Sequence, residues 1–119
     1  MTERRRILLV EDSEFGGQTV ALVLRSYGHQ VEWVRNGHDA RIAASSRPQV
    51  IIVDRGLPDC DGVGLAAELR DLLAPSPVRV VVLSGEPRPE SSPVDGWLEK
   101  PVSNQELLRA IGGAAPVDP

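Results

Sequence analysis

Five polar side chains stand where short apolar runs of the chain end, and their types suit metal and phosphoryl chemistry. An unbroken apolar run is typical of a strand that is buried on both faces. Glu11 and Asp12 are adjacent acids, and like charges disfavour each other's ionised form. The five are Glu11 and Asp12 after Ile7–Val10, Asp54 at the end of Val50–Asp54, Ser84 at the end of Val78–Ser84, and Lys100 after Trp97–Glu99.

Carboxylates gathered closely are typical ligands of a hard divalent cation such as Mg²⁺, which binds oxygen atoms and keeps room for a phosphate. We therefore interpret Glu11 and Asp12 as one wall of a metal site. The carboxylate of Asp54 has two possible roles, because it can be a third ligand or a nucleophile that accepts a phosphoryl group as an aspartyl phosphate. The metal, the lysine and the hydroxyl would each neutralise or hydrogen-bond phosphoryl oxygens.

The alternation of apolar runs with amphipathic stretches predicts an α/β fold. Short strands alternating with helices imply a parallel sheet that is covered on both faces through right-handed crossovers. In such sheets, sites form in the crevice beyond the carboxyl ends of the strands, where the polar side chains are expected. The expected strands are Arg6–Val10, Gln30–Val34, Val50–Asp54, Val78–Ser84 and Trp97–Glu99, and the expected helices are Glu14–Tyr27, Gly37–Ser45, Gly62–Leu73 and Asn104–Ile111.

The helix boundaries carry recognisable signals. Gly28 and Gly112 suit the C-termini of the first and last helices, because glycine tolerates the left-handed backbone that is common there. Asn36 suits an N-cap, and Ser103 with Glu106 has the pattern of a capping box. These signals support the order of strands and helices given above.

The chain has 119 residues and a mass of 12.9 kDa, which predicts one domain. We assign residues 1–113 to that domain and residues 114–119 to a tail or the start of a linker. A net charge of −4 and a pI near 5.1 argue against direct nucleic-acid binding, which needs a basic face. A single cysteine and the lack of a long apolar segment predict no internal disulfide, no membrane insertion and a cytoplasmic location.

Four motifs follow one another along the chain: VEDS (Val10–Ser13), VDRGLPDCDG (Val53–Gly62), VLSG (Val82–Gly85) and WLEKPV (Trp97–Val102). Together, in this order, they resemble the receiver domain of two-component response regulators. The resemblance extends from Ile7 to Ile111 and implies a flavodoxin-like, doubly wound sheet of five parallel strands in the order 2-1-3-4-5. It implies also that a histidine kinase or phosphotransfer protein passes a phosphoryl group to Asp54, after which the chain signals through altered protein–protein interactions.

The resemblance assigns the metal ligands. Asp12 and Asp54 would bind Mg²⁺ directly, together with the backbone carbonyl of Gly56. Glu11 would act largely through water. Any enzyme activity would be limited to self-phosphorylation and slow self-dephosphorylation.

The same resemblance assigns the residues that respond to the phosphoryl group. Ser84 and Lys100 would contact it, and Ser84 and Trp97 would form the switch, with Trp97 in the family's aromatic position. The Lys100–Pro101 peptide bond would be cis, which costs little before proline.

The stretch from residue 85 to residue 96 departs from the family pattern. From Ser84 to Lys100 the chain is about one and a half turns of helix shorter than expected for a receiver domain. Pro87, Pro89 and Pro93 each oppose a regular helix. We therefore expect a fourth helix that is shortened or missing, an irregular loop whose order changes on phosphorylation, and an output surface unlike the family's.

Three other functions are alternatives to that of a phosphoacceptor. A pseudo-receiver, which signals without phosphorylation, is favoured by the irregular stretch and opposed by the intact Asp54, Ser84 and Lys100. A haloacid-dehalogenase-type phosphatase would need a second aspartate where Gly56 stands. A flavodoxin would need a phosphate loop where the acids of EDSEFGG (residues 11–17) would repel phosphate. The chain is expected to be either a stand-alone regulator or a piece of a longer protein.

The remaining unusual positions are given no part in the site. His29 and His38 are expected on the surface, because no metal-ligand spacing surrounds them. Cys60 is expected in an exposed loop without a base to activate it. Gly16 and Gly17 would cost the first helix roughly 1 kcal/mol each relative to alanine. They are either tolerated there or allow a partner helix to approach, and we favour tolerance.

Overall fold

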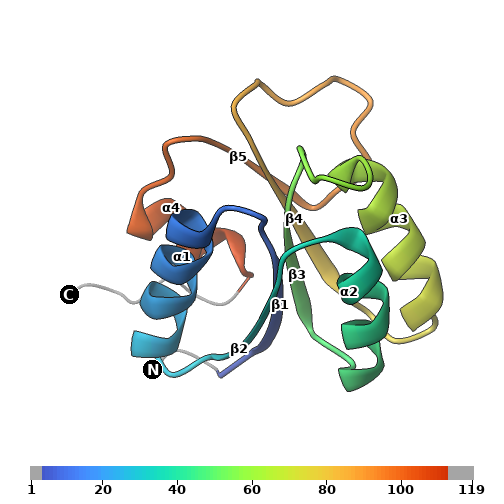
Figure 1. Cartoon of the computed structure of the whole chain (residues 1–119), viewed down its shortest axis with the longest axis horizontal. Coiled ribbons are helices and arrows are strands. Elements are labelled where there is room, and N and C mark those ends of the chain that lie inside the picture. Colours follow the sequence, from blue (N-terminus) through green and yellow to red (C-terminus); the bar gives the residue numbers. More distant parts are fainter. Residues whose placement is uncertain (1–3, 113–119) are drawn as a thin grey trace.

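A computed structural model describes residues 4–112 as one five-stranded parallel sheet with helices on both faces (Figure 1). The strands are β1 (Arg6–Val10), β2 (Gln30–Val34), β3 (Val50–Asp54), β4 (Arg79–Ser84) and β5 (Gly96–Glu99), in the order β2-β1-β3-β4-β5. The helices are α1 (Glu14–Ser26), α2 (Gly37–Ala43), α3 (Gly62–Leu73) and α4 (Asn104–Ala110), with a 3₁₀ turn η1 (Ala44–Ser46) after α2. The predicted flavodoxin-like fold is confirmed. The assigned tail, residues 114–119, lies outside the described residues.

The sheet separates two apolar layers, because successive residues of a strand point to opposite faces. In β1, Leu8 and Val10 pack in the layer beneath α2 and α3, whereas Ile7 and Leu9 pack beneath α1 and α4. Figure 1 shows these two helix pairs on opposite sides of the sheet. Every residue of β3 is buried, and so is all of β4 after its first residue, as expected for strands covered on both faces.

The helix ends follow the predicted signals. Asn36 caps α2, and Ser103 with Glu106 forms a complete capping box at α4. Gly28 and Gly112 adopt φ angles of 93° and 80°, the left-handed backbone that favours glycine at a helix C-terminus. Predicted and observed boundaries differ by one or two residues at several ends. Within residues 4–112, no helix is long and apolar enough to cross a membrane.

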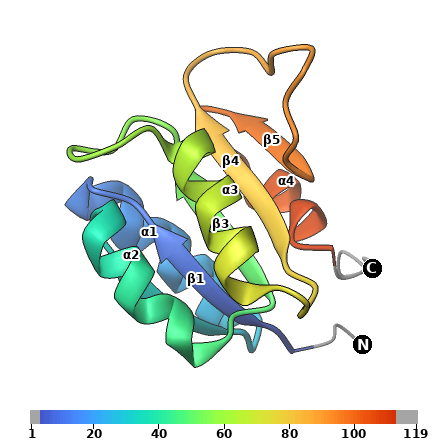
Figure 2. The same ribbon diagram turned by 90° about the vertical axis from the view of Figure 1, so that its right-hand side faces the viewer.

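The connection from β4 to β5, residues 85–95, is an irregular loop without a helix. Figure 2 shows it looping beyond the ends of the two strands. The end of the loop next to β5 is held against β4 and α3. The Asp95 carboxylate accepts a hydrogen bond from the Val80 N–H (2.7 Å) and pairs with Arg70 (2.5 Å), while Val94 is buried in the layer beneath α3. The prediction that the helix between β4 and β5 is shortened or missing is confirmed.

His29 is buried, so the expectation that it lies on the surface is wrong. Its side chain is 4% exposed in the turn between α1 and β2, and its Nδ1 accepts a hydrogen bond from the backbone N–H of Arg5 (3.1 Å). Burial, and then the positive charge of Arg5, lowers the pKa of the imidazole because both disfavour its charged form. The expectation for His38, which is exposed, is confirmed.

We predict that acid destabilises the protein through His29. The pKa of His29 is lower in the folded protein than the value of 6.5 in the unfolded chain, so the unfolded chain binds the proton more readily. The neutral imidazole therefore stabilises the fold above pH 6.5, and this contribution is lost as the pH falls through the folded pKa. His29→Asn keeps an acceptor but cannot titrate. Urea unfolding at pH values from about 7.5 to about 5 should show the wild type losing stability relative to this variant.

His38→Asn is the matched control, because it removes an exposed histidine. Its stability should follow that of the wild type at each pH. Parallel pH profiles for the wild type and His29→Asn would contradict the prediction.

Candidate functional site

The carboxyl ends of β1 and β3 bring three acidic side chains together. One carboxylate oxygen each of Glu11, Asp12 and Asp54 lies within 4.8 Å of the other two. Glu11 and Asp54 are 2% and 7% exposed, whereas Asp12 is open to solvent. Clustered carboxylate oxygens are the donor set that a hard divalent cation prefers. The structure therefore brings Glu11, Asp12 and Asp54 close together, as predicted from the sequence.

Lys100 supplies the positive charge among these acids. Its Nζ lies 2.8 Å from Asp54 Oδ1 and 3.5 Å from Glu11 Oε1. Burial by itself would lower the pKa of the lysine, but the two carboxylates outweigh it and the pKa is raised. The ammonium group is therefore held in its charged form.

Burial dominates the chemistry of Glu11. It raises the pKa of the Glu11 carboxyl, and the neighbouring Asp54 acts in the same direction. The Ser13 N–H opposes this by donating to Glu11 Oε2 (3.2 Å), as does the lysine. Three carboxylates against one ammonium leave negative charge in excess, which a divalent cation would balance.

Trp33 and Arg35 hold the backbone of the acidic segment. The Trp33 Nε1–H donates to the carbonyl of Glu11 (2.8 Å), and Arg35 Nη2 donates to the carbonyl of Asp12 (3.0 Å). The Arg35 guanidinium also lies over the Trp33 ring, 5.6 Å from its centroid. Neither residue was predicted to belong to the site, because nothing in the sequence at the end of β2 shows that side chains there reach the segment after β1.

Gly17 is required where Trp33 packs against α1. A Cβ at position 17 would overlap the indole ring of Trp33. The expectation that this glycine is merely tolerated is therefore wrong, and the group that approaches is a side chain of the same chain rather than a partner helix. Gly16 is different, since a Cβ there would meet only the side chains of Ser13 and Glu11, at 3.3 and 3.4 Å.

The loop that follows Asp54 is closed by backbone contacts. Gly56 and Asp61 form an antiparallel bridge, and the Gly62 N–H donates to the carbonyl of Arg55 (2.8 Å). A Cβ on Gly62 would overlap the carbonyl of Asp54, so glycine allows α3 to begin directly against the end of β3. The backbone around Gly56, the expected source of a carbonyl ligand, is thereby fixed.

Cys60 lies in the loop between β3 and α3, as expected, but its own side chain is half-buried there. It packs against the layer beneath α2 and α3, and its Sγ would lie 2.5 Å from a Cβ on Gly37. Burial raises the pKa of its thiol, which opposes a nucleophilic role.

Ser84 ends β4 beside the acids and is 5% exposed. Its Oγ accepts a hydrogen bond from the Glu86 N–H (3.0 Å), so its own hydroxyl hydrogen is not used in that bond. Its carbonyl accepts from the Lys100 N–H (2.8 Å), and the Lys100–Pro101 peptide bond that follows is cis. A cleft of about 410 Å³ opens here, lined by Asp54, Arg55, Gly56, Asp61, Ser84, Gly85 and Glu86.

Trp97 lies at the edge of this region. Its ring is half-buried against the layer beneath α3, and its Nε1–H donates to the carbonyl of Glu86 (2.8 Å). The Arg55 guanidinium covers the ring, 5.5 Å from its centroid. Trp97 was predicted as a switch residue, but its partners Glu86 and Arg55, which lie 11 and 42 residues away along the chain, were not predicted.

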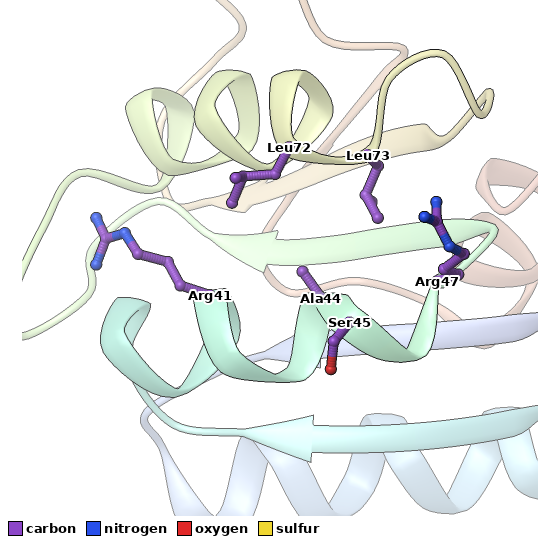
Figure 3. A pocket seen from close by; sticks show the side chains of 6 residues that line it. All are labelled: Arg41, Ala44, Ser45, Arg47, Leu72 and Leu73. Atoms are coloured by element: carbon purple, nitrogen blue, oxygen red, sulfur yellow. The ribbon is translucent and has the colours of Figure 1, made fainter.

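A separate hollow of about 290 Å³ lies between α2, η1 and the end of α3 (Figure 3). In this view Arg41 and Arg47 stand at its two ends, and Leu72 and Leu73 of α3 border it from above. Its lining residues are Arg41, Ala44, Ser45, Arg47, Leu72 and Leu73. The hollow shares no lining residue with the acidic cluster or with the cleft beside Asp54, so it is separate from the site at the strand ends.

Comparison with known proteins gives one consistent family. The family model described as "Response regulator receiver domain" matches residues 7–112. The chain is similar to protein PilH of Pseudomonas aeruginosa, with 29% identity over 89% of this chain and 93% of PilH. It is also similar to the gliding motility regulatory protein of Myxococcus xanthus, with 32% identity over 74% of this chain. The chain spans only 12% of the length of that second relative.

A solved structure has the same fold. It is a response regulator protein from Burkholderia pseudomallei with a phosphorylated aspartic acid, calcium ion and citrate. The TM-score is 0.79 at 27% identity, and the match covers 90% of this chain and 66% of that chain.

Gly17→Ala should destabilise the protein. In an ordinary helix this change would stabilise by about 1 kcal/mol, but here the added methyl group collides with the Trp33 ring. We expect a net loss of roughly 1–3 kcal/mol in the free energy of unfolding, measured in urea.

Gly16→Ala is the control from the adjacent position, and it should leave stability unchanged or raise it. If Gly17→Ala proved as stable as the wild type, the packing argument for Gly17 would fail.

Asp12→Asn should stabilise the metal-free protein and weaken Mg²⁺ binding. Removing one of three clustered charges relieves repulsion, and because Asp12 is exposed we expect a gain of only about 0.5 kcal/mol. Urea unfolding in the presence of a chelator measures the first effect, and a Mg²⁺ titration measures the second. Glu90→Gln, which removes an exposed charge elsewhere, is the control. A less stable Asp12→Asn protein would count against excess negative charge at this site.

Proposed function

The chain belongs to the response regulator receiver domain family, and from that premise we propose that it is a phosphoacceptor switch whose acceptor is Asp54. The observation that carries the proposal is the buried Asp54 carboxylate at the mouth of a cleft, with Lys100 Nζ at 2.8 Å and Ser84 beside it. The phosphorylated aspartic acid in the related Burkholderia pseudomallei protein supports it.

The donor we propose is a phosphohistidine on a histidine kinase or phosphotransfer protein. An Asp54 carboxylate oxygen attacks phosphorus, so that a P–O bond forms as the P–N bond of the donor breaks, and the histidine nitrogen regains a proton from solvent. The lysine ammonium balances charge on the phosphoryl oxygens, and the Ser84 hydroxyl donates to one of them. Both groups already stand at the acceptor in the free protein.

The residues present fit a magnesium ion, since the three carboxylates outnumber the single ammonium among them. We propose that Asp12, Asp54 and the Gly56 carbonyl hold the ion directly and that Glu11 contributes through water. When bound, Mg²⁺ supplies positive charge to the phosphoryl oxygens. Trp33 and the closed loop after Asp54 keep the backbone of these ligands in place.

A pseudo-receiver is the second candidate, because the connection from β4 to β5 has no helix. Against it stands the complete set of acceptor, lysine and hydroxyl around one cleft. The two functions differ in one measurable property, the covalent modification of Asp54.

Intact-mass measurement tests the proposal. Incubation with Mg²⁺ and a small acyl phosphate should add the mass of one phosphoryl group to the wild type. Asp54→Ala should abolish the addition, and Asp71→Ala, at an exposed position on α3, should not. Modification that persists in Asp54→Ala, or none in the wild type with an active kinase, would overturn the proposal and leave the pseudo-receiver.

A further inference from the structure

Arg55, the residue directly after the acceptor, lines the cleft beside Asp54 and contacts three other side chains. Its Nη1 lies 3.5 Å from Glu86 Oε1, and its Nε lies 3.6 Å from Asp61 Oδ1. The flat face of the guanidinium covers Trp97. Through these contacts Arg55 joins the end of β3 to the start of the loop and to β5.

These contacts are weak and easily exchanged. Both ion pairs are long, and the Asp61 and Glu86 side chains are 58% and 78% exposed. Exposed ion pairs contribute little to stability, because water screens them. Asp61 also keeps a second partner, since its Oδ2 accepts from the Gly64 N–H (3.2 Å) as the N-cap of α3. The guanidinium can therefore leave both acids at small cost.

Arg55 is also the single basic residue among those that line the cleft beside Asp54. The other charged groups in that lining are the acids Asp54, Asp61 and Glu86, which would repel a phosphoryl group. A guanidinium presents paired N–H donors that match two phosphate oxygens, and such charge-assisted contacts are stronger than those to a screened carboxylate.

We propose that Arg55 is a ligand of the phosphoryl group, and that it leaves Glu86 and the face of Trp97 when Asp54 is phosphorylated. This inference rests on the proposed function of Asp54. Arg55 then acts together with Lys100, so that two cations hold the phosphoryl group.

The exchange would pass directly to the loop through Glu86. The backbone N–H of Glu86 donates to Ser84 Oγ, its carbonyl accepts from the Trp97 indole, and its carboxylate pairs with Arg55. Withdrawal of Arg55 uncovers the Trp97 ring and leaves the Glu86 carboxylate facing a phosphoryl group of like charge. The environment of Trp97 and the order of residues 85–95 change as a result.

Beryllofluoride, a non-covalent mimic of a phosphoryl group, provides the test at a fixed Mg²⁺ concentration. Fluorine-19 NMR measures its affinity, and the indole N–H signal of Trp97, assigned with Trp97→Phe, reports the switch. Arg55→Gln should bind roughly tenfold more weakly than the wild type. Its Trp97 signal should already be displaced in the free protein and should move less than half as far on binding.

Arg41→Gln removes the same charge from a distant surface of α2 and should behave as the wild type. Arg55→Lys keeps the positive charge but lacks the planar guanidinium with its paired donors, so its beryllofluoride affinity should lie between those of Arg55→Gln and the wild type. If Arg55→Gln does not fold, the affinity of Arg55→Lys relative to the wild type is the test. Wild-type affinity in the Arg55 variants, or an undiminished Trp97 shift in Arg55→Gln, would overturn the inference.

The proposed function is tested separately in the same titration. If the wild type binds beryllofluoride and Asp54→Ala does not, the function of Asp54 stands whatever the Arg55 variants do. If the wild type itself does not bind, the proposed function fails and the role of Arg55 fails with it.

Discussion

The ammonium group of Lys100 lies between two carboxylates that would otherwise repel each other. Its contacts with Asp54 and Glu11 join a residue that follows β5 to the ends of β3 and β1. The two carboxylates are buried and the lysine is partly exposed, so loss of the lysine would leave two buried negative charges without a partner. The remaining negative charge would be balanced by a divalent cation, and in the proposed function the lysine offsets charge on the phosphoryl group.

The acids are positioned mainly by contacts to their backbone. On the β1 side the indole of Trp33 and the guanidinium of Arg35 bind the carbonyls of Glu11 and Asp12. On the β3 side the loop after Asp54 closes on itself, and α3 starts directly against it at Gly62. Backbone contacts of this kind position the acids without using their carboxylate oxygens, which suits a site for ligands.

The loop between β4 and β5 is fastened at both ends and irregular between them. At its start Glu86 is bound to Ser84 and Trp97, and at its end Asp95 is bound to β4 and α3. A segment held in this way can change its order without moving the sheet, because its middle contributes little to the core. In the proposed switch, a change at Ser84 or Arg55 would reach this loop through their contacts with Glu86.

The sequence alone determined the order of the strands and helices, their caps, the absent helix and the set of polar residues at the strand ends. Apolar runs, cap residues and prolines act within a few neighbours, and the carboxyl ends of parallel strands meet at one edge. Only the tertiary structure decided that Gly17 accommodates Trp33, that His29 is buried and that Arg55 covers Trp97. Each of these depends on residues that are far apart in the chain or lie in turns without a periodic pattern. Local sequence carries no signal for such contacts, because they arise only when the sheet brings separate elements together.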